Sequence, residues 1–168
     1  MYTSAERSDQ EQATAAGYHA SLAVCVIEAL QSSVTDESDT AVVVDRYVAY
    51  RHAQGEIAEA DGVRALLRTF EEVGGCEQWA GKVGNYRRRY DPAGAPVAGA
   101  AIEHAAELFY THRIDTETDL RRAADDQAKF ASLESGLREI TGSSDAWFTL
   151  LELAGLENRF ALVDAVAA

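Results

Sequence analysis

Hydrophobic residues recur every three or four positions along most of the chain, which is the period of one face of an α-helix. The first such pattern runs from Ala13 to about Ser33 and carries Leu22, Val26 and Leu30. A polar stretch, residues 32–40, then interrupts it. We therefore expect a first helix that ends near Ser33.

The segment that follows this polar stretch has two possible assignments. Residues 41–44 read Ala-Val-Val-Val, and valine-rich runs favour strands by propensity alone. The pattern continues, however, from Arg46 to His52, and no partner strand is evident. We therefore expect a second helix that begins near Ser38 or Asp39.

The middle of the chain predicts two more helices and one long loop. Asp61 is a candidate cap for a helix whose apolar stripe runs from Val63 to Val73, and the glycine pair 74–75 stops it. A short helix with Trp79 follows. The segment 84–96 holds both prolines and is expected to be the main loop.

The second half of the chain predicts further helices with recognisable starts. Pro96 suits the first position of a helix, and Thr116 with Asp119 forms a capping box for the next. Later helices are expected on both sides of the interruption at 141–144, and a last short one over 160–167. We therefore expect an all-α, compact domain of about seven to nine helices over residues 12–168, after a flexible N-terminus, residues 1–11.

Composition narrows the class of protein. The 168 residues suit one domain, and 47% of them are hydrophobic. The two cysteines, Cys25 and Cys76, show no metal-ligand or disulfide spacing. The sequence also has no histidine spacing typical of a metal site and no phosphate-binding glycine signature, so no metal or cofactor is expected. The chain shows neither an apolar leader nor a membrane-length apolar run, so we expect no membrane association and a cytoplasmic protein. The net charge of −13 argues against a generic nucleic-acid binder.

The stretch from Leu137 to Ala168 carries the most suggestive motif. A hairpin, Thr141-Gly142-Ser143-Ser144, separates two expected helices, and Asp164 follows the second one. This arrangement resembles the helix-hairpin-helix DNA glycosylase superfamily, which has the endonuclease III-like fold. In that family the hairpin reads Pro-Gly-x-Gly and a catalytic aspartate follows. The resemblance extends over roughly residues 18–168, and 83–90, 96–106 and 113–115 also contribute to it.

The chain departs from the family pattern at several positions. Thr141 replaces the proline, Ser144 replaces the second glycine, and Ala146 stands where bifunctional members carry a lysine. Lyase chemistry is therefore not implied. The family's C-terminal helices have no counterpart in these 168 residues, so we expect an apolar face that they would otherwise cover.

The resemblance implies a set of functional residues. Main-chain amides at Gly142, Ser143 and Ser144 would bind a DNA phosphate, and Asp164 would be the catalytic carboxylate of an N-glycosidic hydrolase. The one basic cluster, Arg87, Arg88 and Arg89, would hold further phosphates. Each has a plainer interpretation: the serines cap the following helix, the arginines pair with surface carboxylates, and the aspartate is a solvated or capping group.

Two functions follow from these observations. The first is a DNA-associated, glycosylase-like protein that contacts duplex DNA, either a monofunctional base-excision hydrolase or an inactive derivative. The second is a non-catalytic helical module that binds a protein partner or a second copy of itself through the uncovered apolar face.

Overall fold

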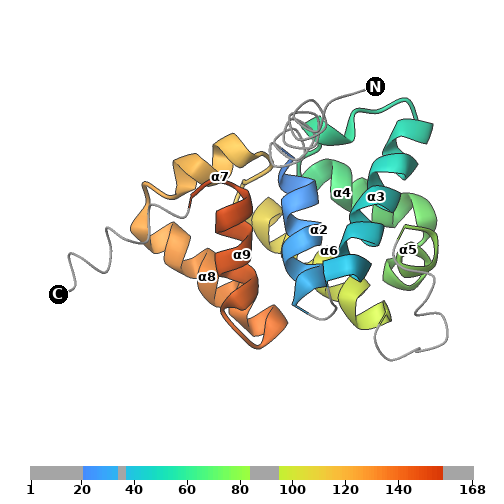
Figure 1. Cartoon of the computed structure of the whole chain (residues 1–168). Helices are drawn as coiled ribbons and strands as arrows, with labels where there is room; N and C mark the ends of the chain where they lie inside the picture. The colour runs from blue at the N-terminus through green and yellow to red at the C-terminus, as the bar shows by residue number, and fades with distance from the viewer. Residues whose placement is uncertain (1–20, 34–36, 84–94, 157–168) are drawn as a thin grey trace, which may run out of the picture.

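The computed structural model describes residues 21–33, 37–83 and 95–156, and the expected helix at 160–167 and the N-terminal 1–11 lie outside them (Figure 1). Within these ranges the chain forms eight α-helices, one 3-10 turn and no strand, which confirms the all-α expectation. The elements in chain order are α2 (Leu22–Ser32), α3 (Glu37–Ala53), η1 (Ala58–Ala60), α4 (Val63–Val73), α5 (Cys76–Lys82), α6 (Ala95–Thr111), α7 (Glu117–Ala123), α8 (Gln127–Thr141) and α9 (Asp145–Leu153).

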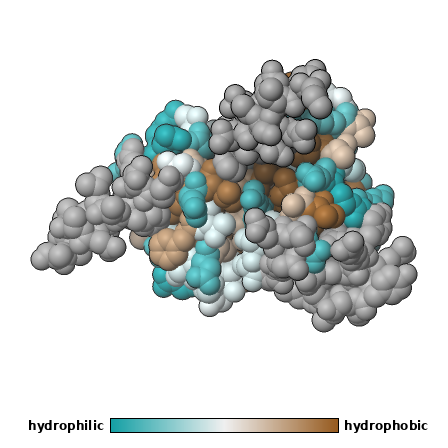
Figure 2. All heavy atoms as spheres, in the orientation of Figure 1, coloured by the Kyte–Doolittle hydropathy of each residue, from teal (hydrophilic) through white to brown (hydrophobic). Residues whose placement is uncertain are grey.

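Helix α2 is the centre of the fold. Its residues are apolar on almost every side, and Leu22, Cys25, Val26 and Leu30 are each at most 1% exposed. It packs against α3, α4, α6 and α9, so it is surrounded by helices (Figure 1). A helix that is hydrophobic all round must be buried. In the space-filling view, hydrophobic residues run along the middle of the face shown, with hydrophilic ones beside them (Figure 2).

The valine-rich segment is helical, as the continuing pattern indicated. Val43, Val44 and Val48 are buried against α2, while Val42 remains 42% exposed. Valine loses side-chain freedom in a helix, so its intrinsic preference opposes this conformation. Burial of one face against α2 outweighs that preference, because tertiary packing contributes more than propensity.

Helices α4 and α5 are joined by a glycine turn and held together by stacked rings. Gly74 takes the left-handed conformation with φ 98°, and it ends α4 as the glycine pair predicted. Phe70 on α4 stacks on Trp79 of α5, with ring centroids 4.6 Å apart. The Trp79 indole N–H donates to the Thr69 hydroxyl over 2.9 Å. This pair of helices packs in turn on α6.

Helices α7, α8 and α9 lie together on one side of the molecule (Figure 1). The expected capping box at the start of α7 is present: Thr116 Oγ1 accepts from the Asp119 N–H, and the Asp119 carboxylate accepts from the Thr116 N–H. Phe130 of α8 meets Trp147 of α9 edge to face at 4.8 Å. Both α8 and α9 reach the core, since α9 packs on α2 and α8 on α6.

Two expected helix starts differ in the structure. Asp61 does not cap α4: the N-cap residue is Gly62, without a side-chain bond, and the Asp61 carboxylate is bound elsewhere. The first amides of α4 donate instead to Asp115, which is distant in sequence: Val63 N–H to its carbonyl and Arg64 N–H to its carboxylate, both over 2.9 Å. Helix α6 begins at Ala95, one residue before the proline.

Candidate functional site

A buried ion pair joins α3 to the segment before α4. The Arg51 guanidinium donates through Nε and Nη2 to the two Asp61 carboxylate oxygens, at 2.7 and 3.2 Å. The Tyr47 hydroxyl donates to the same carboxylate at 2.8 Å, so burial and the neighbouring negative charge raise the pKa of Tyr47. The Asp61 carboxylate also raises the pKa of Arg51. Tyr47 and Arg51 are four residues apart, so they share one face of α3.

This polar cluster continues to the surface. Nη1 of Arg51 donates to the Gln54 side chain, and the Gln54 amide donates to Glu72 on α4 at 2.7 Å. Tyr50 donates to the same Glu72 carboxylate. At the other end, the Ser21 hydroxyl donates to the Asp61 carbonyl at 2.9 Å. The polar atoms of this cluster are thus engaged in holding α2, α3 and α4 together. In the described ranges, no cluster of histidine, cysteine or carboxylate side chains could hold a metal.

The α8–α9 connection bends sharply at Gly142. Gly142 follows α8 with φ 77°, a left-handed conformation that favours glycine. The Gly142 N–H donates to the Arg138 carbonyl at 2.8 Å. The Ser143 and Asp145 amides donate to the hydroxyls of Thr141 and Ser143, at 3.4 and 3.3 Å. A phosphate at this bend would have to replace these bonds.

The two serines of the hairpin bind different groups in the structure. Ser144 is the N-cap residue of α9 by position, but its hydroxyl makes no cap bond and accepts from Arg138 Nε at 3.0 Å. The hydroxyl that accepts from the first amide of α9 is that of Ser143. Asp164 and the arginines 87–89 lie outside the described residues, so DNA binding and catalysis by them stay predictions.

The exposed side of α9 carries an aromatic ring between two carboxylates. Phe148 is 50% exposed, and Asp145 and Glu152, three residues before and four after it, are exposed as well. This spacing places the three side chains on one face of the helix. Behind this face, the Trp147 indole N–H is buried and has no hydrogen-bond partner among the residues that the structure describes. An unpaired buried donor is unfavourable by about 1–3 kcal/mol.

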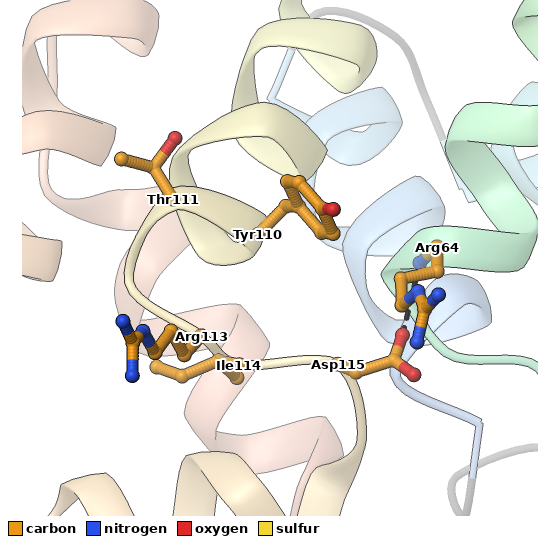
Figure 3. Close-up of a pocket in the computed structure, with 6 residues that line it drawn as sticks. All are labelled: Arg64, Tyr110, Thr111, Arg113, Ile114 and Asp115. Carbon is orange, nitrogen blue, oxygen red and sulfur yellow. Dashed lines mark hydrogen bonds between the residues drawn. The ribbon is translucent and has the colours of Figure 1, made fainter.

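A pocket of about 540 Å³ lies where the end of α6 turns towards α7 and meets the start of α4. Its lining residues are Arg64, Tyr110, Thr111, Arg113, Ile114 and Asp115. In the close-up, the Tyr110 ring lies between Arg113 and Thr111 on one side and Arg64 and Asp115 on the other (Figure 3). The ring is 53% exposed and both arginines are exposed.

Arg64 and Arg113 line the pocket, and they share with the exposed Arg68 a guanidinium group for which the structure gives no partner among the described residues. Arg121, Arg122 and Arg138 each bind a carboxylate of their own helix. Within the described ranges, neither the Arg64 nor the Arg113 guanidinium forms a hydrogen bond or ion pair. The net charge of the chain is −13, so carboxylates are abundant. Two guanidinium groups beside one pocket with no carboxylate partner among the described residues are therefore unexpected.

The backbone at Arg113 is strained. Helix α6 ends in a turn in which Ile114 N–H donates to the Phe109 carbonyl and Arg113 N–H to the Tyr110 carbonyl, both over 2.9 Å. This is a Schellman motif, and its left-handed position normally holds glycine. Here Arg113 occupies it with φ 59°. No other non-glycine residue that the structure describes has a positive φ. An L-residue pays about 1–2 kcal/mol for this conformation.

Sequence reasoning did not single out this pocket. Arg64 lies on α4, about 50 residues before Arg113, and no motif connects them. The one local signal was the absence of glycine after Thr111, at the end of a strongly periodic helix.

Comparison with known proteins gives a family and no function. No curated protein and no solved structure matches the chain. One family model matches residues 2–160, which is nearly the whole chain and includes every element described above. The chain therefore belongs to the family described as Domain of unknown function (DUF8548).

Proposed function

We propose that this protein is a non-catalytic helical module that binds a protein partner through the outer face of α9. The observation that carries the proposal is the half-exposed ring of Phe148 between the exposed carboxylates of Asp145 and Glu152. Aromatic rings are the side chains most often found at the energetic centre of protein interfaces. Full burial of such a ring contributes about 1.5–3 kcal/mol, and covering the half of Phe148 that is still exposed contributes roughly half of that.

The charge of this face indicates the chemistry of the partner. A carboxylate on either side of Phe148 favours a segment in which an apolar side chain is flanked by lysine or arginine. The net charge of −13 acts in the same direction at long range and increases the association rate of basic partners. A second copy of this chain would bring another −13 to the interface, so a basic partner is favoured over a homodimer.

A defined peptide tests this proposal. A synthetic helix-forming peptide of about 18 residues would carry leucine on one face and lysine on the others. We expect its affinity to fall by about three- to tenfold in Phe148→Ser, which corresponds to the lost burial of the exposed half of the ring. Val42→Ser is the matched control, because Val42 is similarly exposed but lies on α3. Equal affinity for a scrambled peptide of the same composition would refute the proposal.

Light scattering extends the same experiment to self-association. A dimer that Phe148→Ser dissociates would identify the partner as a second copy of the chain. A monomer that binds the peptide more weakly as salt rises supports the basic partner, since salt screens exposed charges.

A DNA-associated, glycosylase-like protein remains the second candidate function. It is supported by the tight bend between α8 and α9 with Gly142 in the left-handed conformation. The bonds that the amides of Gly142, Ser143 and Asp145 make within the bend oppose it. A gel shift with duplex DNA at low salt, lost when Arg87, Arg88 and Arg89 are replaced by alanine, would favour this candidate. Hydrolysis abolished by Asp164→Asn would make it an enzyme.

A further inference from the structure

We propose that the pocket between α4 and the α6–α7 turn binds a phosphorylated nucleoside. Its charge is the first argument. The guanidinium groups of Arg64 and Arg113 line it without a partner in the described ranges, and a ligand with negative charge would supply one. Arginine presents several N–H donors in a plane, and this geometry matches phosphate oxygens.

The size and shape of the pocket favour an occupant larger than a lone phosphate ion. The pocket volume of about 540 Å³ lies in the range that holds small organic ligands. Figure 3 shows the Tyr110 ring between the other side chains that line the pocket, and its exposed face offers a flat surface to a planar group. A heterocyclic base that stacks on this ring would use that surface, and every base can stack in this way.

The end of the pocket beside α4 suits the polar edge of such a ligand. Arg64 supplies donors there, and Asp115 supplies acceptors beside it (Figure 3). One Asp115 oxygen, Oδ1, already accepts from the Arg64 main-chain N–H, which fixes the carboxylate in place. A donor and an acceptor held side by side can bind the hydroxyls of a ribose or the edge of a base. The phosphate then falls at the Arg113 end.

The backbone of Arg113 is an independent argument for a ligand. The left-handed position of this turn favours glycine, yet the chain places an arginine there. The turn needs no side chain at this position, because its two main-chain bonds and the buried Ile114 close it. The arginine side chain therefore has no part in closing the turn, whereas it does line the pocket.

Calorimetric titration with adenosine monophosphate, adenosine and inorganic phosphate tests the proposal on the full chain. We expect the monophosphate to bind at about millimolar or tighter concentration and each fragment to bind at least about tenfold more weakly. Guanosine, cytidine and uridine monophosphates define the preference for a base. If none of the four nucleotides binds, or if inorganic phosphate binds as tightly as they do, the proposal is wrong.

Arg113→Gly separates the ligand role from the fold. Binding should fall by about tenfold or more, whereas the unfolding midpoint should rise because glycine relieves the left-handed strain. Arg68→Ala is the matched control, since Arg68 is an exposed arginine one turn from Arg64 that does not line the pocket. It should leave nucleotide affinity unchanged. Unchanged affinity in both Arg113→Gly and Arg64→Ala would overturn the proposal. The Phe148 face is remote from these substitutions in sequence, so peptide binding should persist in them.

Discussion

Arg51 and Asp61 form a two-bond ion pair in the interior, and their side chains are only 4% and 7% exposed. The pair joins the C-terminal half of α3 to the segment that leads into α4. Removing either charge leaves the other buried without compensation, which is far more costly than the pair itself is stabilising. The stability of the fold is therefore expected to depend strongly on keeping both members of this pair.

The first prediction concerns this pair. Asp61→Asn should lower the free energy of unfolding by about 3–5 kcal/mol, measured by urea denaturation, because the Arg51 charge stays buried. Glu56→Gln is the control: Glu56 approaches Arg51 at 4.0 Å but is 55% exposed, so its loss should cost less than about 1 kcal/mol. The double variant Arg51→Met with Asp61→Leu should recover much of the loss. Equal effects of Asp61→Asn and Glu56→Gln would contradict the buried pair.

Sequence reasoning found the helices and several of their ends for identifiable reasons. Local signals determine these features: the helical period of the apolar residues, the left-handed glycine at Gly74 and the reciprocal bonds of Thr116 and Asp119. Each depends on residues within one or two turns. These features can therefore be predicted from the sequence without knowledge of the tertiary structure.

The misassigned features depend on contacts between distant segments. Asp61 looked like a cap for the helix that follows it, yet Arg51 and Tyr47 bind its carboxylate. The amides that it would have capped go to Asp115, over 50 residues away. The pocket likewise combines the start of α4 with the end of α6. Periodicity identifies the faces of helices, but not which loop closes on which helix end.

The second prediction concerns two glycines whose replacement by alanine should change the stability of the fold in opposite directions. A Cβ at Gly62 would lie 2.4 Å from the Asp115 carbonyl oxygen, which is main chain and cannot move aside cheaply. Gly62→Ala should therefore destabilise the fold and separate α4 from the α6–α7 turn. A Cβ at Gly81 meets nothing within 4 Å, and Gly81 lies inside α5. Gly81→Ala should stabilise by about 0.5–1 kcal/mol through reduced chain entropy. Thermal midpoints that shift in the same direction would contradict this assignment.

The third prediction concerns acid stability at the start of α7. The Thr116 N–H, above all, lowers the pKa of Asp119, and the Asp115 N–H and the Arg122 charge act in the same direction. A carboxylate whose folded pKa is depressed contributes stability that is present above its unfolded pKa, about 3.9. That contribution is lost as the pH falls through the lower folded value. The stability gap between the native chain and Asp119→Asn should therefore be largest near neutral pH and shrink below about pH 4.

Denaturation midpoints measured from acid to neutral pH check this behaviour. Glu139→Gln removes one negative charge from an exposed side chain of α8 and controls for net charge. A gap for Asp119→Asn that stays constant with pH would show that the carboxylate does not stabilise the capping box as an ion.

The fourth prediction separates the two cysteines. The pKa of the Cys25 thiol is raised to about 12, chiefly because the thiol is buried in α2. Cys25 is only 1% exposed. The thiolate is the reactive form, so Cys25 should resist a thiol reagent at neutral pH until the chain unfolds. Cys76 at the start of α5 is half-buried and should react in the folded protein. Mass spectrometry after brief labelling should therefore find one modified site in buffer and two in denaturant. Labelling of Cys25 in the folded chain would mean that α2 opens locally.

The fifth prediction compares the two tryptophans, which are both 1% exposed and both packed against a phenylalanine ring. Trp79→Phe and Trp147→Phe remove the same atoms, so the loss of packing is similar. The indole N–H of Trp79 has a partner in Thr69, whereas that of Trp147 has none within the described part of the chain. Substitution at position 79 breaks a bond, while substitution at position 147 removes an unpaired buried donor. Urea denaturation should thus find Trp79→Phe more destabilising by about 1–3 kcal/mol. The reverse order would indicate that the Trp147 N–H gains a partner in solution, such as an ordered water.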